Sequence, residues 1–284
     1  MAENEGADEE LAIESLLSST LAVYQSSPIV GSARLPSPDE SSCAKYLASL
    51  RKRMLPFLEL VSDRYENSGR TTGIGSQSWS ATTTEELRKD GQSVDVHTVK
   101  FQACKFVILV SRADNNTEND ARIVIFSRAS RQLHSVFAKW IELYFDVVVR
   151  PVRFSSEFLL QFVDDYVASC YRAEESTSLE IEFTTGIAEA SRITLSFDAE
   201  DVQRFARSAA GGDDNGPTAV ARLLNHVQAS SAIKFSQLKA GRVACKGGVV
   251  SAEGKIKLVA STSQEWRVSF AERWIAEVAE IVWR

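Results

Sequence analysis

The chain has 284 residues, of which 44% are hydrophobic and 25% charged, so it can bury a core, and disorder of the whole chain is excluded. Its formal net charge of −6 excludes a uniformly basic nucleic-acid binder. The charge is unevenly distributed, because residues 1–40 hold eight acids and one base, whereas the remainder holds 30 acids and 31 bases. We therefore expect an acidic N-terminal segment on a folded body that is neutral overall.

The first half of the chain predicts helices followed by strands. Apolar spacing predicts one helix over 9–25 and, after a proline-rich linker, a second from 41 to about 61, which Pro56 should kink or end. Residues 67–82 are rich in Gly, Ser and Thr and predict a loop. Three strands are expected next, and the last two should form an antiparallel hairpin. These strands are 93–98, 105–110 and 121–126.

The second half mixes helices with strands in no regular alternation. Expected helices are 129–145, 155–171, 198–207, 218–229 and 263 to the end. Expected strands are 145–151, the paired runs 178–183 and 192–197, and then 232–238, 240–246 and 255–260. This order predicts an α+β fold with antiparallel or mixed sheets and packed helices. We expect an acidic segment and linker over 1–40, an N-terminal α/β sub-domain over 41–150, and a C-terminal α+β sub-domain over 151–284, ending in an amphipathic helix.

Residue types that support catalysis or cofactor binding are not arranged for either. The three histidines and four cysteines have no metal-ligand spacing, and the cysteines are too dispersed for a disulfide framework. The run Gly248–Lys255 has the wrong spacing for a phosphate-binding loop, and a hairpin turn at Glu253-Gly254 explains it better. No apolar run is long enough to span a membrane, and the acidic N-terminus is no signal peptide. We expect no enzyme activity, no metal, no cofactor and no membrane partner.

Local charge is more informative than the total. Residues 157–201 have a net charge of −9, whereas residues 232–257 have a net charge of +5. The period of two places Arg242 with Lys246 on one strand face and Lys255 with Lys257 on another, and adjacent antiparallel strands would merge them into one basic patch. Such a patch is either an ordinary solvated sheet face or a contact for phosphates.

The last helix carries an unusual density of aromatic residues. Trp266, Phe270 and Trp274 recur every four residues, and Trp283 lies near the end. Core packing explains most of such a stripe, but tryptophan is also enriched at binding hot spots. These four residues are therefore candidates for a partner interface.

Three motifs in the C-terminal half resemble the centromere protein L family of the inner kinetochore. The first is Trp140–Asp146 followed by Val147–Pro151. The second is the pair of strands Leu179–Phe183 and Ile193–Phe197 with the acidic stretch that follows. The third is Gly241–Val243 with Glu253–Leu258 before a terminal apolar helix, and its Gly-Lys-Ile-Lys element is the most specific. The resemblance covers roughly residues 130–284.

This resemblance implies a nuclear, centromeric protein without known catalytic activity. It implies a heterodimer with centromere protein N through the C-terminal domain, contacts with other inner-kinetochore subunits, and basic residues that face DNA. Lys239, Arg242, Lys255 and Lys257 are the positions carried over to DNA contact, and Lys246 lies outside the matched positions. A homodimer is expected when the partner is missing.

Two classes of function remain open. In the first, a non-enzymatic scaffold grips DNA as part of the heterodimer. In the second, an adaptor binds only proteins, and its basic strands pair with an acidic partner.

Overall fold

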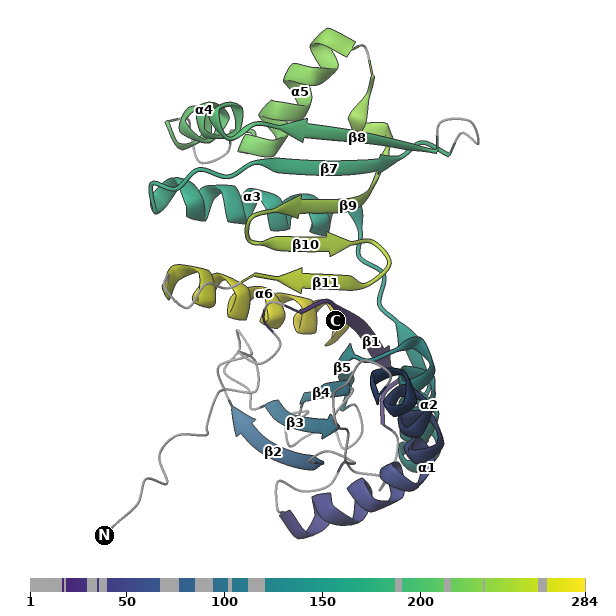
Figure 1. Cartoon of the computed structure of the whole chain (residues 1–284). Helices are drawn as coiled ribbons and strands as arrows, with labels where there is room; N and C mark the ends of the chain where they lie inside the picture. The colour runs from purple at the N-terminus through teal and green to yellow at the C-terminus, as the bar shows by residue number, and fades with distance from the viewer. Residues whose placement is uncertain are drawn as a thin grey trace, which may run out of the picture. The chain divides into compact units, whose positions relative to one another are not determined.

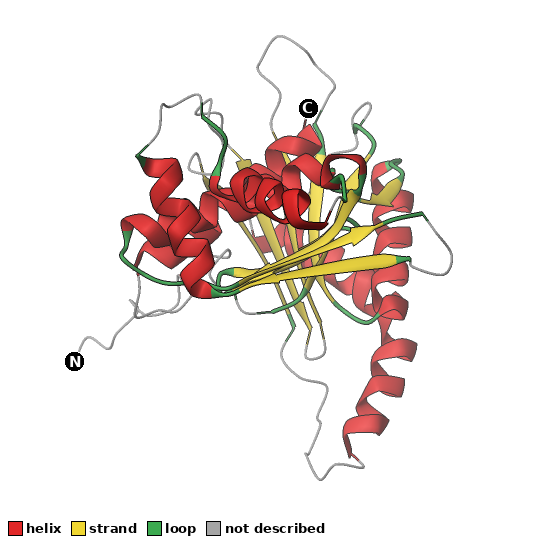
Figure 2. Cartoon of the chain, turned by 90° about the horizontal axis from the view of Figure 1, so that it is seen from above, coloured by secondary structure: helices red, strands yellow, loops and turns green. Residues whose placement is uncertain are grey.

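A computed structural model describes residues 17, 19–29, 35, 40–66, 77–84, 94–101, 104–111, 121–186, 191–211, 216–231, 233–259 and 265–283. The chain divides into two compact units, one built on Leu21–Val152 with Ile275–Arg284, the other on Arg153–Trp274 with Leu17–Thr20 (Figure 1). The structure combines helices with strands (Figure 2). Both units contain antiparallel strands, and the elements do not follow a regular β-α-β order along the chain. The α+β prediction is confirmed.

Six strands of the first unit form an antiparallel sheet. Its order is β2-β3-β4-β5-β1, and β6 also pairs with β1. The strands are β1 (Leu21–Ser26), β2 (Ser78–Thr84), β3 (Val94–Phe101), β4 (Cys104–Ser111), β5 (Ile123–Arg128) and β6 (Val149–Pro151). Strand β4 is almost continuously apolar because residues on both of its faces are buried.

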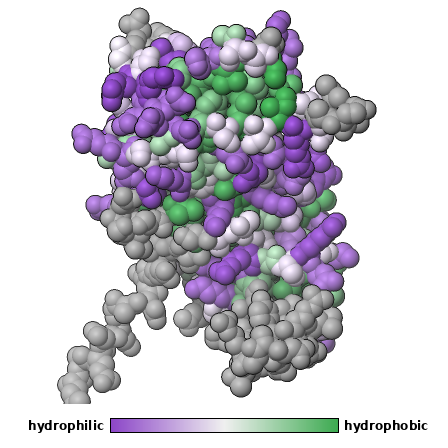
Figure 3. Space-filling view, turned by 45° about the horizontal axis from the view of Figure 1, so that its top comes forward, coloured by the Kyte–Doolittle hydropathy of each residue, from purple (hydrophilic) through white to green (hydrophobic). Residues whose placement is uncertain are grey.

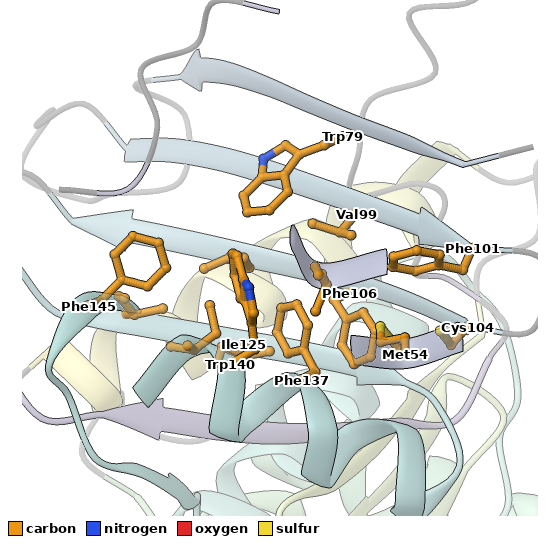
Figure 4. Close-up of a cluster of buried hydrophobic side chains, with 14 of the residues drawn as sticks. Met54, Trp79, Val99, Phe101, Cys104, Phe106, Ile125, Phe137, Trp140 and Phe145 are labelled. Atoms are coloured by element: carbon orange, nitrogen blue, oxygen red, sulfur yellow. The ribbon is translucent and has the colours of Figure 1, made fainter. Parts of the chain in front are cut away.

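Two helices pack against this sheet and complete the core of the first unit. They are α1 (Glu40–Glu66) and α2 (Arg131–Phe145). The rings of Phe106 on β4 and Phe137 on α2 stack at 3.8 Å between centroids, and Trp79 meets Trp140 edge-on at 5.6 Å (Figure 4). The side chain of Ser130 caps α2 by accepting the Leu133 N–H.

The second unit contains an antiparallel sheet in the order β11-β10-β9-β7-β8. Its strands are β7 (Leu179–Thr184), β8 (Arg192–Phe197), β9 (Lys239–Cys245), β10 (Gly248–Ser251) and β11 (Lys255–Leu258). Its helices are α3 (Ser156–Arg172), α4 (Ala199–Ala210), α5 (Ala219–Ser231) and the first part of α6 (Glu265–Trp283). Helix α3 lies against β9 and packs its aromatic residues on α6.

The predicted helix over 9–25 is wrong where the structure describes it. Residues 21–26 form strand β1, with Leu21 and Val23 each 1% exposed. The spacing of two between Leu21 and Val23 fits a strand, whereas the spacing of four between Leu17 and Leu21 fits a helix. Pairing with β5 on one side and β6 on the other decides for the strand, because it satisfies the backbone along both edges. Residues 9–16 lie outside the described residues.

Other boundaries also differ from the predictions. Strand β2 occupies part of the expected loop, and β10 lies in a segment for which no strand was predicted. Residues 235–237 form a short 3₁₀ helix instead of a strand, because Phe235 turns inward onto the ring of Phe183. Strand β6 is shorter than expected, since α2 continues to Phe145. Helix α1 continues past Pro56 to Glu66 and does not end there.

Candidate nucleic-acid interface

Strand β11 turns its lysines away from the core of the second unit. Ile256 and Leu258 are 1% and 3% exposed, so the alternating Lys255 and Lys257 point to the opposite face. Residues directly opposite in neighbouring strands share a face, and Ser251 on β10 links Lys255 to Arg242 on β9. We call this side of β7–β11 the open face. Sequence reasoning placed both lysines correctly on one face.

Strand β10 separates the two groups of bases. The sequence predicts that the strands carrying Arg242 and Lys255 are neighbours, which is wrong, because β10 pairs with both. Neighbouring strands lie about 4.8 Å apart, so Arg242 and Lys255 emerge roughly 10 Å from each other. The bases thus lie on two strands, β9 and β11, with β10 between them.

Lys239 joins the open face at the start of β9. It pairs with Thr184, whereas the next residue, Ala240, is buried opposite Phe183. The register of β7 and β9 shifts between Glu182 and Phe183, which keeps Lys239 outward despite the odd spacing from Arg242. We call Lys239, Arg242, Lys255 and Lys257 the basic strip.

Acidic residues on β7 reach the same face, which sequence reasoning missed. Glu180 lies 2.6 Å from Arg242, and Glu182 lies 3.1 Å from Arg192 on β8. Lys255 lies 3.6 Å from Glu253, but both side chains are more than 60% exposed, so water screens this pair. The alternation in β7 indicates that both glutamates point outward; only the strand order shows that they meet the arginines.

Lys246 does not lie in the basic strip. Strand β9 ends at Cys245, and Lys246 lies in the following turn, where its ammonium group donates to the Ser176 carbonyl at 2.8 Å. The prediction that it shares a strand face with Arg242 is wrong, because the turn breaks the period of two. This placement does not support the DNA contact predicted for Lys246.

The aromatic residues of α6 have different environments. Phe270 and Trp274 are 4% and 1% exposed and pack on Phe158, Phe162 and Tyr166 of α3. Their side chains therefore belong to the core, and this burial does not support the partner contact predicted for them. Trp266 and Trp283 are only partly buried.

A charged network fixes the start of α6 in the second unit. Glu175 accepts hydrogen bonds from the indole of Trp266 at 3.0 Å and from the guanidinium of Arg267 at 2.5 Å. Desolvation disfavours the Glu175 carboxylate, but these hydrogen bonds outweigh it and lower its pKa. Trp266 thus has a structural partner within its own unit.

Candidate ligands for a metal ion are not clustered in the described part of the chain. No cluster of three or more His, Cys, Asp or Glu side chains there could hold a metal ion. Burial raises the pKa of the Cys104 and Cys245 thiols to about 12, which suppresses the reactive thiolate. Of the helices described, none combines the length and apolarity needed to cross a membrane.

Comparison with known proteins identifies one family. The family described as Centromere protein L matches residues 95–282, which is more than half of the chain. No curated protein matches the sequence. The match includes all four residues of the basic strip.

Proposed function

The chain belongs to the centromere protein L family, and from this premise we propose that it is a non-enzymatic subunit of the inner kinetochore. The family makes it a centromere protein. In the proposal, it works in the nucleus as a heterodimer with a centromere protein N-like subunit, contacts further inner-kinetochore subunits, and helps hold centromeric DNA. The second unit supplies both the partner contact and the DNA contact.

The basic strip is the observation that carries the DNA part of this proposal. Four long cationic side chains stand on one open sheet face, and their apolar neighbours are buried beneath them. Within the described part of the chain, neither Lys239 nor Lys257 has an ion-pair partner. Flexible cations on a sheet can contact phosphates without reading bases, which suits binding to any sequence.

Edge strand β8 supports the partner contact. Strand β8 ends the sheet order of the second unit, and its inward residues Ile193 and Leu195 are only half-buried. A hydrophobic area is visible in the upper part of Figure 3, where the second unit lies. An exposed edge with apolar side chains can accept a strand from another chain. The same edge would support a homodimer when the partner is missing.

The test of DNA contact uses the heterodimer with Lys255 and Lys257 both changed to Glu. We expect the heterodimer to form normally and DNA affinity to fall equally for unrelated sequences, with a salt dependence reduced by about two units for two lost phosphate contacts. The matched control is Lys100→Glu with Arg128→Glu, two exposed bases of the first unit. Unchanged affinity and slope in the double Glu variant would reject the DNA contact.

A protein-only adaptor is the second candidate, and one observation favours it. Glu180 and Glu182 already bind Arg242 and Arg192 on the open face, so this face accommodates carboxylates. An acidic partner segment would meet the remaining lysines in the same way. In that case the Lys255 and Lys257 variant would lose heterodimer or subunit binding, while DNA affinity would stay at the level of the control.

A further inference from the structure

The end of α2 exposes large apolar side chains that the core of the first unit does not use. Leu143 is 67% exposed, Tyr144 44% and Val148 49%, and these are three of the five large hydrophobic residues exposed in the described part of the chain. Their neighbours Trp140 and Phe145 are fully buried, so the core beneath them is complete. Large apolar residues exposed within a stretch of six residues are a candidate interaction site.

Helix α1 contacts Tyr144 and holds it in place. The hydroxyl groups of Tyr144 and Ser49 lie 2.6 Å apart, and the guanidinium of Arg53 lies 5.9 Å from the centroid of the Tyr144 ring. Tyr144 also meets the rings of Tyr46 and Trp140, at 6.1 and 5.1 Å between centroids. The ring is thus fixed by several contacts while almost half of the side chain faces solvent.

The neighbouring surface of α1 is basic. Lys45, Ser49 and Lys52 follow at spacings of four and three, which places them on one face of the helix, and Arg53 lies beside them. Lys45, Lys52 and Arg53 are exposed, and residues 41–58 contain four bases and no acid. We call the surface formed by Lys45, Lys52, Arg53, Leu143 and Tyr144 the α1–α2 seam.

Helix α2 adds a further exposed base beside the apolar residues. Lys139 is exposed and lies one helical turn before Leu143, so both face the same side. The nearby Glu142 carboxylate accepts the Val149 N–H at 3.0 Å and is therefore occupied within the fold. Asp146, in the left-handed conformation at the end of α2, is an exposed acid of this region. Bases thus outnumber acids around the apolar residues.

We propose that the α1–α2 seam binds an acidic peptide segment of a partner protein that carries at least one large apolar residue. The carboxylates of the peptide would meet Lys45, Lys52 and Arg53, and its apolar residue would cover Leu143 and the Tyr144 ring. Charge complementarity selects an acidic occupant, and the exposed apolar area selects one with a hydrophobic anchor. DNA phosphates would satisfy the bases but would leave Leu143 uncovered.

The test measures binding of a synthetic peptide to the full chain by fluorescence anisotropy. The probe has a central Phe-Leu pair flanked by glutamates, and its two companions carry Lys in place of Glu or Ala in place of Phe and Leu. We expect only the first peptide to bind, with an affinity that falls as salt rises. Leu143→Ser and Lys52→Glu with Arg53→Glu should each weaken binding about tenfold.

Matched variants separate the seam from general surface effects. Ile281→Ser changes another exposed apolar residue, and Lys100→Glu with Arg128→Glu changes two exposed bases elsewhere; both should bind the peptide normally. All of these positions are at least one-third exposed, so melting temperatures should stay close to that of the parent chain. Equal peptide binding by Leu143→Ser and the parent chain would overturn the proposal.

Other occupants give different results, and each would overturn the proposal. Self-association that Leu143→Ser abolishes would assign the seam to a second copy of the chain. Binding of a single-stranded oligonucleotide that depends on Lys52 and Arg53 but not on Leu143, in the absence of peptide binding, would assign it to nucleic acid. A tenfold gain in peptide affinity on removal of residues 1–16 would assign it to the acidic N-terminal segment.

Discussion

Arg242 stands directly opposite Glu182 in the register of β9 and β7, yet its guanidinium binds Glu180, at 2.6 Å. Glu182 instead lies 3.1 Å from Arg192 on the next strand. Each arginine thus has one carboxylate, and the acidic side of the open face is neutralised internally. The lysines of β11 and Lys239 remain as the cationic part of this face.

Releasing Arg242 should strengthen phosphate binding. In the variant Glu180→Gln, the guanidinium loses its charged partner and becomes available, so we expect DNA affinity of the heterodimer to rise and the salt dependence to increase by up to about one unit. Glu200→Gln on α4 removes an exposed acid away from the strip and is the matched control. If the two variants bind DNA alike, Arg242 is not a phosphate contact.

The network around Glu175 should contribute to folding stability. The side chains of Glu175 and Arg267 are 22% and 17% exposed, so their hydrogen bonds are partly shielded from water. We expect Glu175→Gln to lower the free energy of unfolding at pH 7 by about 1–3 kcal/mol. Chemical denaturation measures this, and the neighbouring exposed Glu174→Gln should have little effect.

The contribution of Glu175 to the free energy of unfolding should depend on pH. The folded state lowers the pKa of Glu175 below its ordinary 4.5, so the stabilisation is present above pH 4.5 and is lost as the pH falls through the lowered value. The difference in stability between the parent chain and Glu175→Gln should therefore shrink in acid. A constant difference from neutral pH to strong acid would show that the effect comes from packing.

His134 should make the first unit sensitive to mild acid. Its ring stacks on Tyr24 at 3.5 Å between centroids, its Nδ1 lies 3.2 Å from the Ser127 hydroxyl, and burial lowers its pKa from 6.5 to about 4. Because the histidine of the unfolded chain has the higher pKa, it takes up a proton before that of the folded chain. The free energy of unfolding should therefore fall by up to about 3 kcal/mol as the pH drops from 6.5 to 4. Urea midpoints across this range measure the loss.

A histidine comparison isolates the source of this effect. His134→Gln should be less stable at neutral pH but should show a flatter profile between pH 4 and 6.5. His226 on α5 is exposed, so His226→Gln should keep the parent profile. Parallel profiles for all three proteins would assign the acid sensitivity to other groups.

Gly247 should tolerate no side chain. A Cβ added there would lie 2.1 Å from the ring of Tyr166, which is fully buried and cannot move aside. We expect Gly247→Ala to lower the free energy of unfolding by about 1–3 kcal/mol, as overpacking does. At Gly241 the nearest atom would be 3.7 Å away, so Gly241→Ala should change it little. Thermal unfolding of both variants shows whether the loss comes from the clash with Tyr166 or from replacing any glycine of this region.

A charge on the edge of β8 should block association. Ile193 is half-buried at this edge, and Ile193→Lys should weaken heterodimer formation at least severalfold, because an edge lysine opposes strand addition. Gln203→Lys on α4 adds the same charge at an exposed site and is the control. Co-purification of the tagged protein with its partner measures the loss. Normal assembly by Ile193→Lys would exclude this edge as the interface.

Sequence patterns alone predicted those elements whose signal comes from residues close together in the chain. Helix α2 and helix α3 follow from apolar positions every three or four residues, and both begin after a serine whose side chain caps the first turn. The hairpin of β7 and β8 follows from alternation around Gly186, and the outward direction of Lys255 and Lys257 follows from the same period of two. These features depend on neighbours within a few residues, which the sequence displays directly.

Tertiary structure decided the features that depend on contacts between residues far apart in the chain. Leu21–Ser26 became a strand because β5 and β6 pair with it, although Leu21 also continues the helical spacing that precedes it. Phe270 and Trp274 became core because α3 presents Phe158 and Phe162 to them. Arg242 and Arg192 pair with glutamates of β7 because β7 lies between β9 and β8, and the sequence does not show this strand order. Strand order and register are set by contacts between residues far apart in the chain, whose energies no local pattern records.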